Sequence, residues 1–254
     1  MFVNTLLAEW TKLRTTASFW WTTGIILFIS VGWTLLNSLN APEAMLGMSP
    51  LTPDGLGSIM LLMGVPVLMI QGAMVVTTEY RYKLPATVYM ANPNRWMVAL
   101  AKLVMYAFLA AVIMFLNLVL IFVLADLTTN PSAAEAFTPF SDEAGQRLLW
   151  VYPLGAVGIV LFVQGLGWIM RQTAGTVAVS LILYLGLESV VRLLPKVGDK
   201  IIHFMPFEGF YQWTNNTVDP NAPWDNVAMG GVIFFIWAVA LWVIGVVALE
   251  KRDA

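Results

Sequence analysis

The chain has no cysteine, one histidine and few charged residues. Without cysteine it has no disulfide bond, no thiol nucleophile and no thiolate metal ligand. A single histidine, His203, cannot build a histidine metal cluster, and no serine with a neighbouring base suggests a nucleophilic site. We therefore expect no catalytic residue and no metal ligand. The net charge of −2 gives no overall basic field, so we also expect no nucleic-acid partner.

What the chain has in excess is hydrophobic sequence. Of its 254 residues 59% are hydrophobic and 11% are charged, whereas a soluble domain is about half apolar and about a quarter charged. This composition predicts an all-α integral membrane protein with a single transmembrane domain over residues 1–254. A helix needs about 20 mostly apolar residues to cross the hydrocarbon. Six stretches meet that length: residues 19–39, 56–78, 103–125, 148–170, 173–194 and 227–249.

Basic residues concentrate in the connections on one side of the predicted spans. That side holds Lys12, Arg14, Arg81, Lys83, Arg95, Lys102, Arg171, Lys251 and Arg252, and the other holds Arg147, Arg192, Lys196 and Lys200. Short loops rich in lysine and arginine stay in the cytoplasm. We therefore expect a multi-pass protein of the cell membrane with both termini cytoplasmic, because the number of crossings is even. Glu9 and the late basic residues also disfavour an N-terminal signal peptide.

The first 17 residues predict an amphipathic helix that lies in the cytoplasmic membrane interface. Apolar residues recur at near-helical spacing from Phe2 to Leu13, with Trp10 as an aromatic anchor. The candidate site residues of this helix are Glu9, Trp10, Lys12 and Arg14. Two interpretations stay open: an ordinary juxtamembrane helix that obeys the positive-inside rule, or an elbow that braces the first span against a partner.

A short polar segment follows the second predicted span. Its candidate contact residues are Glu79, Tyr80, Arg81, Lys83, Pro93 and Arg95. Arginine pairs bidentately with carboxylates and tyrosine offers rigid contact area, so the segment suits docking to a cytoplasmic partner. The same residues would also serve simply to maintain topology. Glu79, at the membrane exit of the span, is expected to pair with Arg81, Lys83 or a basic residue of the first helix.

Few polar residues lie inside the predicted spans. Glu188 is the one carboxylate there, and we expect it to pair with Arg192 one turn later, near the external end of the fifth span. The alternative for these two residues is a substrate-facing charge or an inter-subunit lock. Amides in three spans are expected to hydrogen-bond neighbouring helices: Gln71, Asn117 and Gln164. The aromatic stretch 200–213 predicts a pair of short interfacial or re-entrant helices.

Several motifs, in order, resemble one family. The start Ala8-Glu9-Trp10-Thr11-Lys12-Leu13-Arg14-Thr15-Thr16, followed by Phe19-Trp20-Trp21, resembles the opening of ATP-binding-cassette (ABC) type 2 permeases of Gram-positive bacteria. Later motifs that resemble the same family are Thr78-Glu79-Tyr80-Arg81, Pro93-x-Arg95 with Lys102, Gly165-x-Gly167 with Arg171, and Lys251-Arg252-Asp253-Ala254. One departure is Leu84-Pro85, where the family commonly has a Gly-Thr or Thr-Ile step.

The resemblance implies the permease subunit of an ABC transporter, working with a second copy or a related chain. It implies two cytoplasmic ATPase subunits that carry ATP and magnesium. This chain has no Gly-x-x-x-x-Gly-Lys-[Ser/Thr] phosphate loop, so we expect it to bind no cofactor itself. The resemblance further implies export, a bacterial origin and an ATPase-coupling role for the segment from Glu79 to Arg95. The cargo stays open between a lipid, a drug, an antimicrobial peptide and a polysaccharide precursor.

Two other functions are weighed against this one. A secondary carrier needs several ionisable groups inside the membrane, of which only Glu188 is evident. A non-transport membrane subunit that recruits or stabilises a complex would use the same docking segment without moving any cargo.

Overall fold

The computed structural model describes residues 2–44, 49–82, 84, 88–90, 94–195 and 197–251. In this part of the chain the regular elements are helices, and no strand is present. Six helical segments are long and apolar enough to cross a membrane: α2 (Ala17–Leu39), α3 to α4 (Pro53–Arg81), α6 (Arg95–Thr128), α8 (Glu143–Met170), α9 to α10 (Thr173–Arg192) and α13 (Ala228–Lys251). They overlap all six predicted spans, so the prediction of an all-α multi-pass membrane protein is confirmed.

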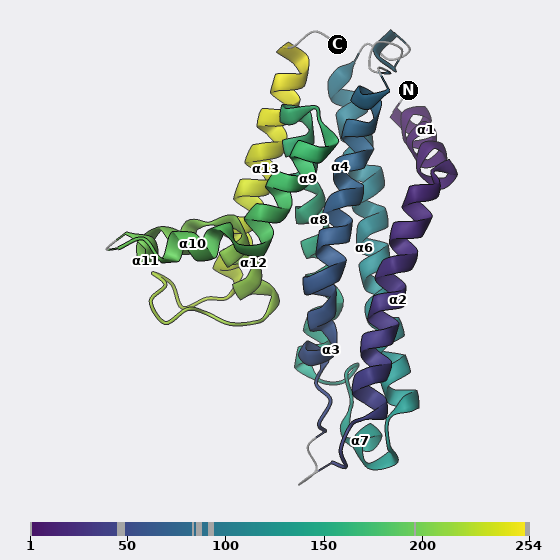
Figure 1. Cartoon of the computed structure of the whole chain (residues 1–254), viewed down its shortest axis with the longest axis vertical. Coiled ribbons are helices and arrows are strands. Elements are labelled where there is room, and N and C mark those ends of the chain that lie inside the picture. The colour runs from purple at the N-terminus through teal and green to yellow at the C-terminus, as the bar shows by residue number, and fades with distance from the viewer. Residues whose placement is uncertain are drawn as a thin grey trace.

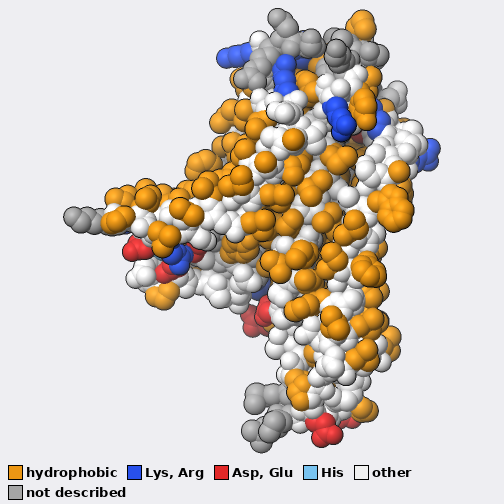
Figure 2. Space-filling view, viewed as in Figure 1, with side chains coloured by type: hydrophobic (Ala, Val, Ile, Leu, Met, Phe, Trp, Pro, Cys, Tyr) orange, Lys and Arg blue, Asp and Glu red, His pale blue; other side chains and the backbone are white. Residues whose placement is uncertain are grey.

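The long helices define two ends of the molecule. α2, α4, α6 and α8 run roughly side by side along its long axis (Figure 1). α1 (Phe2–Thr15) lies at the same end as the last turn of α13, and lysine and arginine side chains gather there (Figure 2). We call this the basic end. Acidic side chains appear at the opposite end, where the short α7 (Pro131–Ala136) lies.

Glycines allow α8 to lie very close to α13. A Cβ on Gly165 would lie 2.6 Å from backbone atoms of Leu241, and a Cβ on Gly245 would lie 2.6 Å from the Gly165 carbonyl oxygen. The two backbones therefore touch where the helices cross, which larger residues would prevent. The glycines of the fourth span thus bring α8 against α13 of the same chain.

Buried amides bond to neighbouring helices, as predicted. Asn117 Nδ2 donates to Ser30 Oγ at 2.9 Å, and Gln71 Nε2 donates to Thr22 Oγ1 at 2.5 Å. Gln164 Nε2 donates to a backbone carbonyl oxygen of α6 at 3.4 Å. Because hydrocarbon offers no water to satisfy an amide, these bonds help to position α2 and α8 against α4 and α6.

α6 is longer than the apolar run from which it was predicted. It begins at Arg95, where the Asn94 side chain accepts a hydrogen bond from Met97 N at 3.1 Å. Its 34 residues cover about 51 Å, well beyond the ~30 Å of a hydrocarbon core. The additional turns at the basic end place Lys102 within the helix and not in a connecting loop.

Two spans contain a π-helical segment, in which the helix widens locally. The second span consists of α3 (Pro53–Ile59), the π segment Met60–Gly64 and α4 (Val65–Arg81), and the fifth of α9 (Thr173–Ile182), the π segment Leu183–Leu187 and α10 (Glu188–Arg192). The Tyr184 hydroxyl in the fifth span donates to the Leu61 carbonyl oxygen in the second at 2.5 Å. One buried hydrogen bond thus joins the two π-helical segments.

The fifth span bends, whereas a straight span to residue 194 was predicted. Beyond the π segment, α10 turns away from the bundle and continues into a side arm (Figure 1). The rest of the arm consists of α11 (Gly198–Ile201), a 3-10 turn (Ile202–Phe204) and α12 (Pro206–Thr214). These elements form the pair of short helices that the stretch 200–213 predicted, and the proline at the first position of α12 favours helix initiation.

Candidate functional site

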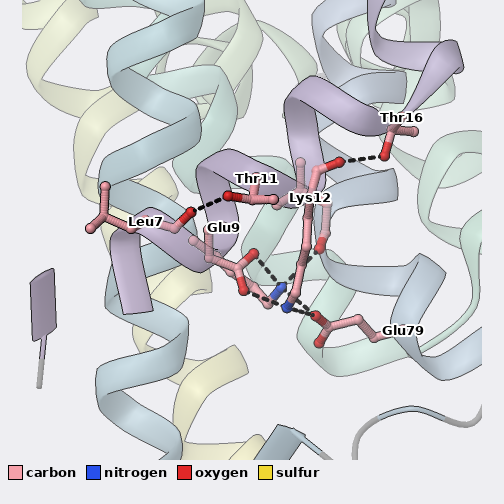
Figure 3. Close-up of polar contacts among 8 residues, drawn as sticks. Leu7, Glu9, Thr11, Lys12, Thr16 and Glu79 are labelled. Carbon is pink, nitrogen blue, oxygen red and sulfur yellow. Dashed lines mark hydrogen bonds and ion pairs between the residues drawn. The ribbon is translucent and has the colours of Figure 1, made fainter. Parts of the chain in front are cut away.

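Four charged side chains from three helices meet near the basic end (Figure 3). Lys102 Nζ of α6 lies 2.8 Å from Glu9 Oε2 of α1 and 2.7 Å from Glu79 Oε1 of α4. Lys12 Nζ of α1 lies 2.6 Å from Glu9 Oε1 and 2.8 Å from Glu79 Oε1. Each lysine therefore contacts both glutamates. We call these four residues the charge quartet.

Three members of the quartet are removed from solvent. The exposed fraction of the side chain is 1% for Lys102, 5% for Glu9 and 9% for Glu79, against 46% for Lys12. Lys102 uses all three donors of its ammonium group, the third toward the Val75 carbonyl oxygen at 3.4 Å. All three N–H groups of the buried Lys102 are thus hydrogen-bonded, whereas the side chain of Lys12 is partly exposed to solvent.

The quartet is electrically balanced, with two cations and two carboxylates. An unpaired ion in the interior costs several kcal/mol, so the two signs must be buried together. Burial lowers the pKa of Lys12, but the attraction of Glu79 and Glu9 outweighs this effect and raises its pKa overall. Lys12 therefore stays charged at neutral pH and compensates the second carboxylate.

The orientation of α1 explains how the quartet forms. Its buried residues are Glu9 and Leu13, while Val3 and Leu7 are exposed at 64% and 57%. Glu9 and Lys12 are three residues apart and so share one face of the helix. α1 thus turns charged groups toward the bundle and leaves part of its apolar surface uncovered. The other two predicted residues of this helix lie further out: Trp10 is partly buried and Arg14 is exposed.

A cavity of about 460 Å³ opens beside the quartet, between α1, α2, α4 and α6. Its lining includes all four quartet residues together with Gln71, Tyr106 and apolar and hydroxyl side chains. The Tyr106 hydroxyl donates to Gln71 Oε1 at 2.7 Å, so the lining continues from ion pairs into a neutral polar pair. The volume falls within the range of ligand pockets, about 300–1,000 Å³.

Two arginines stack on tyrosines at the basic end. Arg171 Cζ lies 5.1 Å from the centre of the Tyr80 ring, and Arg95 Cζ lies 5.1 Å from that of Tyr89. Arg171 has a φ of 54°, the left-handed conformation that commonly ends a helix, and it terminates α8. Arg95 Nη1 also donates to the Leu249 carbonyl oxygen in the last turn of α13 at 3.0 Å. These contacts join the end of α8 to the end of α4, and the start of α6 to the end of α13.

The predicted docking segment divides into buried and exposed residues. Glu79 pairs with Lys12, which confirms the expected pair with a basic residue of the first helix. Tyr80 is partly buried, whereas Arg81 is exposed, with its Cζ 5.8 Å from the centre of the Tyr82 ring. Two residues of the prediction lie outside the described part of the chain: Lys83 and Pro93.

Sequence reasoning missed Lys102 as a site residue. It was assigned to a loop, because the apolar run starts only at residue 103. The signal that could have found it is Asn94, a strong N-cap residue that starts α6 two turns earlier. Glu79 lies near the C-terminal end of the helical segment Pro53–Arg81, just beyond the predicted span that ends at residue 78.

The expected pair of Glu188 with Arg192 is not formed. The two carboxylate oxygens of Glu188 accept hydrogen bonds from Phe207 N at 2.9 Å and Glu208 N at 2.5 Å. Glu188 thus satisfies free N–H groups at the start of α12, where negative charge is favourable. Arg192 instead lies 2.7 Å from Glu208 Oε1 and 3.4 Å from Asp219 Oδ2. Both residues hold the side arm in place.

Neither protein-family models nor curated protein sequences give a match to this chain. Among the described residues, no group of three or more histidine, aspartate or glutamate side chains is arranged to hold a metal ion.

Proposed function

We propose that this chain is the membrane-spanning permease subunit of an ABC exporter in a bacterial cell membrane. In this proposal the basic end faces the cytoplasm, in accord with the positive-inside rule. α1 lies in the cytoplasmic interface and both termini are cytoplasmic. Two copies, or this chain and a related one, combine with two ATPase subunits that bind ATP and magnesium.

The observation that carries the proposal is the charge quartet. Three of its four ion pairs connect α1, the end of α4 and the N-terminal part of α6 to one another, and the fourth lies within α1. Separating buried partners would leave an unpaired charge, at a cost of about 3–5 kcal/mol. A force applied to α1, or to the segment that follows α4, therefore moves both spans together. A permease whose conformational change is driven by a separate ATPase needs such coupled movement of its spans.

Exposed residues next to the quartet supply the proposed docking surface. Arg81 and Tyr82 end α4 in exposed positions, and Trp96 in the first turn of α6 is exposed at 42%. An arginine binds a partner carboxylate in a planar, bidentate geometry, and aromatic rings add contact area at little entropic cost. The quartet and the docking surface are adjacent along α4, so contact at Arg81 acts directly on Glu79.

Co-purification tests the proposal. The chain is expressed together with candidate ABC ATPases of its source organism and purified in mild detergent, and bound ATPase and ATP hydrolysis are measured. We expect Arg81→Glu to lower the affinity for the ATPase at least tenfold. Lys200→Glu is the matched control, because Lys200 is an exposed lysine on the side arm, away from the basic end. Absence of any bound ATPase, together with no effect of Arg81→Glu, would refute the proposal.

A transport measurement separates a permease from a recruitment subunit. The purified complex is placed in proteoliposomes, and ATP-dependent loss of fluorescent lipid, peptide or drug probes from one side of the membrane is followed. A permease moves at least one probe class and stops when Arg81→Glu uncouples the ATPase. Assembly that depends on Arg81 without movement of any probe would instead support a recruitment role.

A further inference from the structure

Within the charge quartet, one ammonium N–H and one carboxylate oxygen make no hydrogen bond to the described part of the chain. Lys12 Nζ makes two hydrogen bonds, to Glu9 and Glu79, so one of its three N–H groups is unused. Glu79 Oε1 receives both lysines, whereas Glu79 Oε2 has no hydrogen-bond partner in the described part of the chain. Because both residues line the cavity, a positive and a negative group face it together.

The charge balance of the quartet favours a ligand that is itself neutral overall. Its two cations and two carboxylates cancel, so a net anion or cation would add an uncompensated charge beside buried groups. A zwitterion adds none. Its cationic group would meet the unused oxygen of Glu79, and its anionic group would meet the unused N–H of Lys12.

The rest of the lining suits a lipid. Apolar side chains of the cavity include Leu13, Phe19 and Met74, which can contact the first carbons of an acyl chain. The cavity is lined in part by α1, whose uncovered apolar residues indicate that this region meets the membrane surface. A ligand with a zwitterionic head and an apolar body therefore fits both parts of the lining.

We propose that this cavity binds the headgroup of a zwitterionic aminophospholipid, such as phosphatidylethanolamine. The primary ammonium donates to Glu79 Oε2, and the phosphate accepts from Lys12 Nζ. A primary ammonium is required because a quaternary one has no N–H to donate to the carboxylate. The proposal needs the basic end to lie at a membrane surface, but it does not depend on the chain being a transporter.

Three lipids with identical acyl chains test the proposal. The delipidated protein in detergent is titrated with phosphatidylethanolamine, phosphatidylcholine or phosphatidylglycerol, and bound lipid is counted by native mass spectrometry. We expect phosphatidylethanolamine to bind at least tenfold more tightly than either of the others. Equal binding of phosphatidylethanolamine and phosphatidylcholine would overturn the proposal, because these two differ only in the N-methyl groups.

Two variants locate the binding. Thr78→Phe fills the cavity from α4 and leaves the quartet intact, so it should abolish the preference, whereas Val3→Phe adds the same ring on the exposed face of α1 and should not. Glu79→Gln gives the quartet a net positive charge and should shift the preference to anionic phosphatidylglycerol. A preference for phosphatidylethanolamine that survives Thr78→Phe would place the binding elsewhere and overturn the proposal. The wild-type comparison stays decisive if a variant fails to fold.

Discussion

Lys102→Met would test how much the quartet stabilises the fold. The lysine side chain is 1% exposed and bridges Glu9 and Glu79, whose side chains are 5% and 9% exposed. Without it two buried carboxylates share only the half-exposed Lys12. Removing one partner of a buried ion pair costs about 3–5 kcal/mol. At about 2–4 °C per kcal/mol for a chain of this size, the midpoint of thermal unfolding should fall by about 6–20 °C.

Tryptophan fluorescence during heating in detergent at neutral pH measures this midpoint. Lys251→Met is the matched control, since Lys251 is an exposed lysine in the last turn of α13 at the same end of the molecule. Its replacement should change the free energy of unfolding by less than about 0.5 kcal/mol. Adding Glu79→Gln to Lys102→Met returns the site to one cation and one carboxylate, so the double variant should regain at least half of the loss. A single variant as stable as the control, or a double variant less stable than the single one, would refute the reasoning.

Two further predictions concern the side arm and alkaline stability. Glu188→Ala removes the carboxylate that accepts hydrogen bonds from Phe207 N and Glu208 N, and each of these bonds stabilises the fold by about 1.5–3 kcal/mol. Amide hydrogen exchange at the start of α12 should therefore accelerate at least tenfold, while exchange in α8 stays unchanged. Equal exchange rates at the start of α12 in wild type and variant would contradict this role. The pKa of Lys12 is raised above 10.5, so its stabilising contribution is complete below that pH and is lost as the pH rises through the folded-state value. Unfolding midpoints of wild type and Lys12→Met, measured from about pH 8 to about pH 12, should therefore converge at the alkaline end, and a constant difference would count against the ion pairs.

The spans could be predicted because crossing a membrane requires a long apolar run, and such runs are visible in the sequence. The ends of the helices could not be predicted in the same way. α6 starts eight residues before its apolar run, at Arg95, because Asn94 caps it and Arg95 contacts the end of α13. The bend that follows the π segment Leu183–Leu187 was not predicted either, since this segment is mostly apolar and continues the apolar run of the fifth span.

The candidate site was predicted in part for a similar reason. A carboxylate at a membrane exit needs a cation, so a partner for Glu79 on the first helix could be expected, and Lys12 is that partner. The burial of Glu9 depends on how α1 rotates against α6, and the position of Lys102 depends on where α6 begins. The pairing of Glu188 with Phe207 N and Glu208 N depends on the fold of the arm. These are contacts between distant segments, which periodicity does not encode.

The hydrogen bond between Tyr184 and the Leu61 carbonyl oxygen has a geometric consequence for the two spans that it joins. A π turn holds one residue more than an α turn, so reverting to α geometry shifts the register by one residue and rotates everything beyond it by about 100°. In the fifth span, that rotation would carry Glu188 away from the start of α12. The bond anchors Tyr184, within the widened turn itself, to the second span. The second span thereby controls the angular setting of the arm.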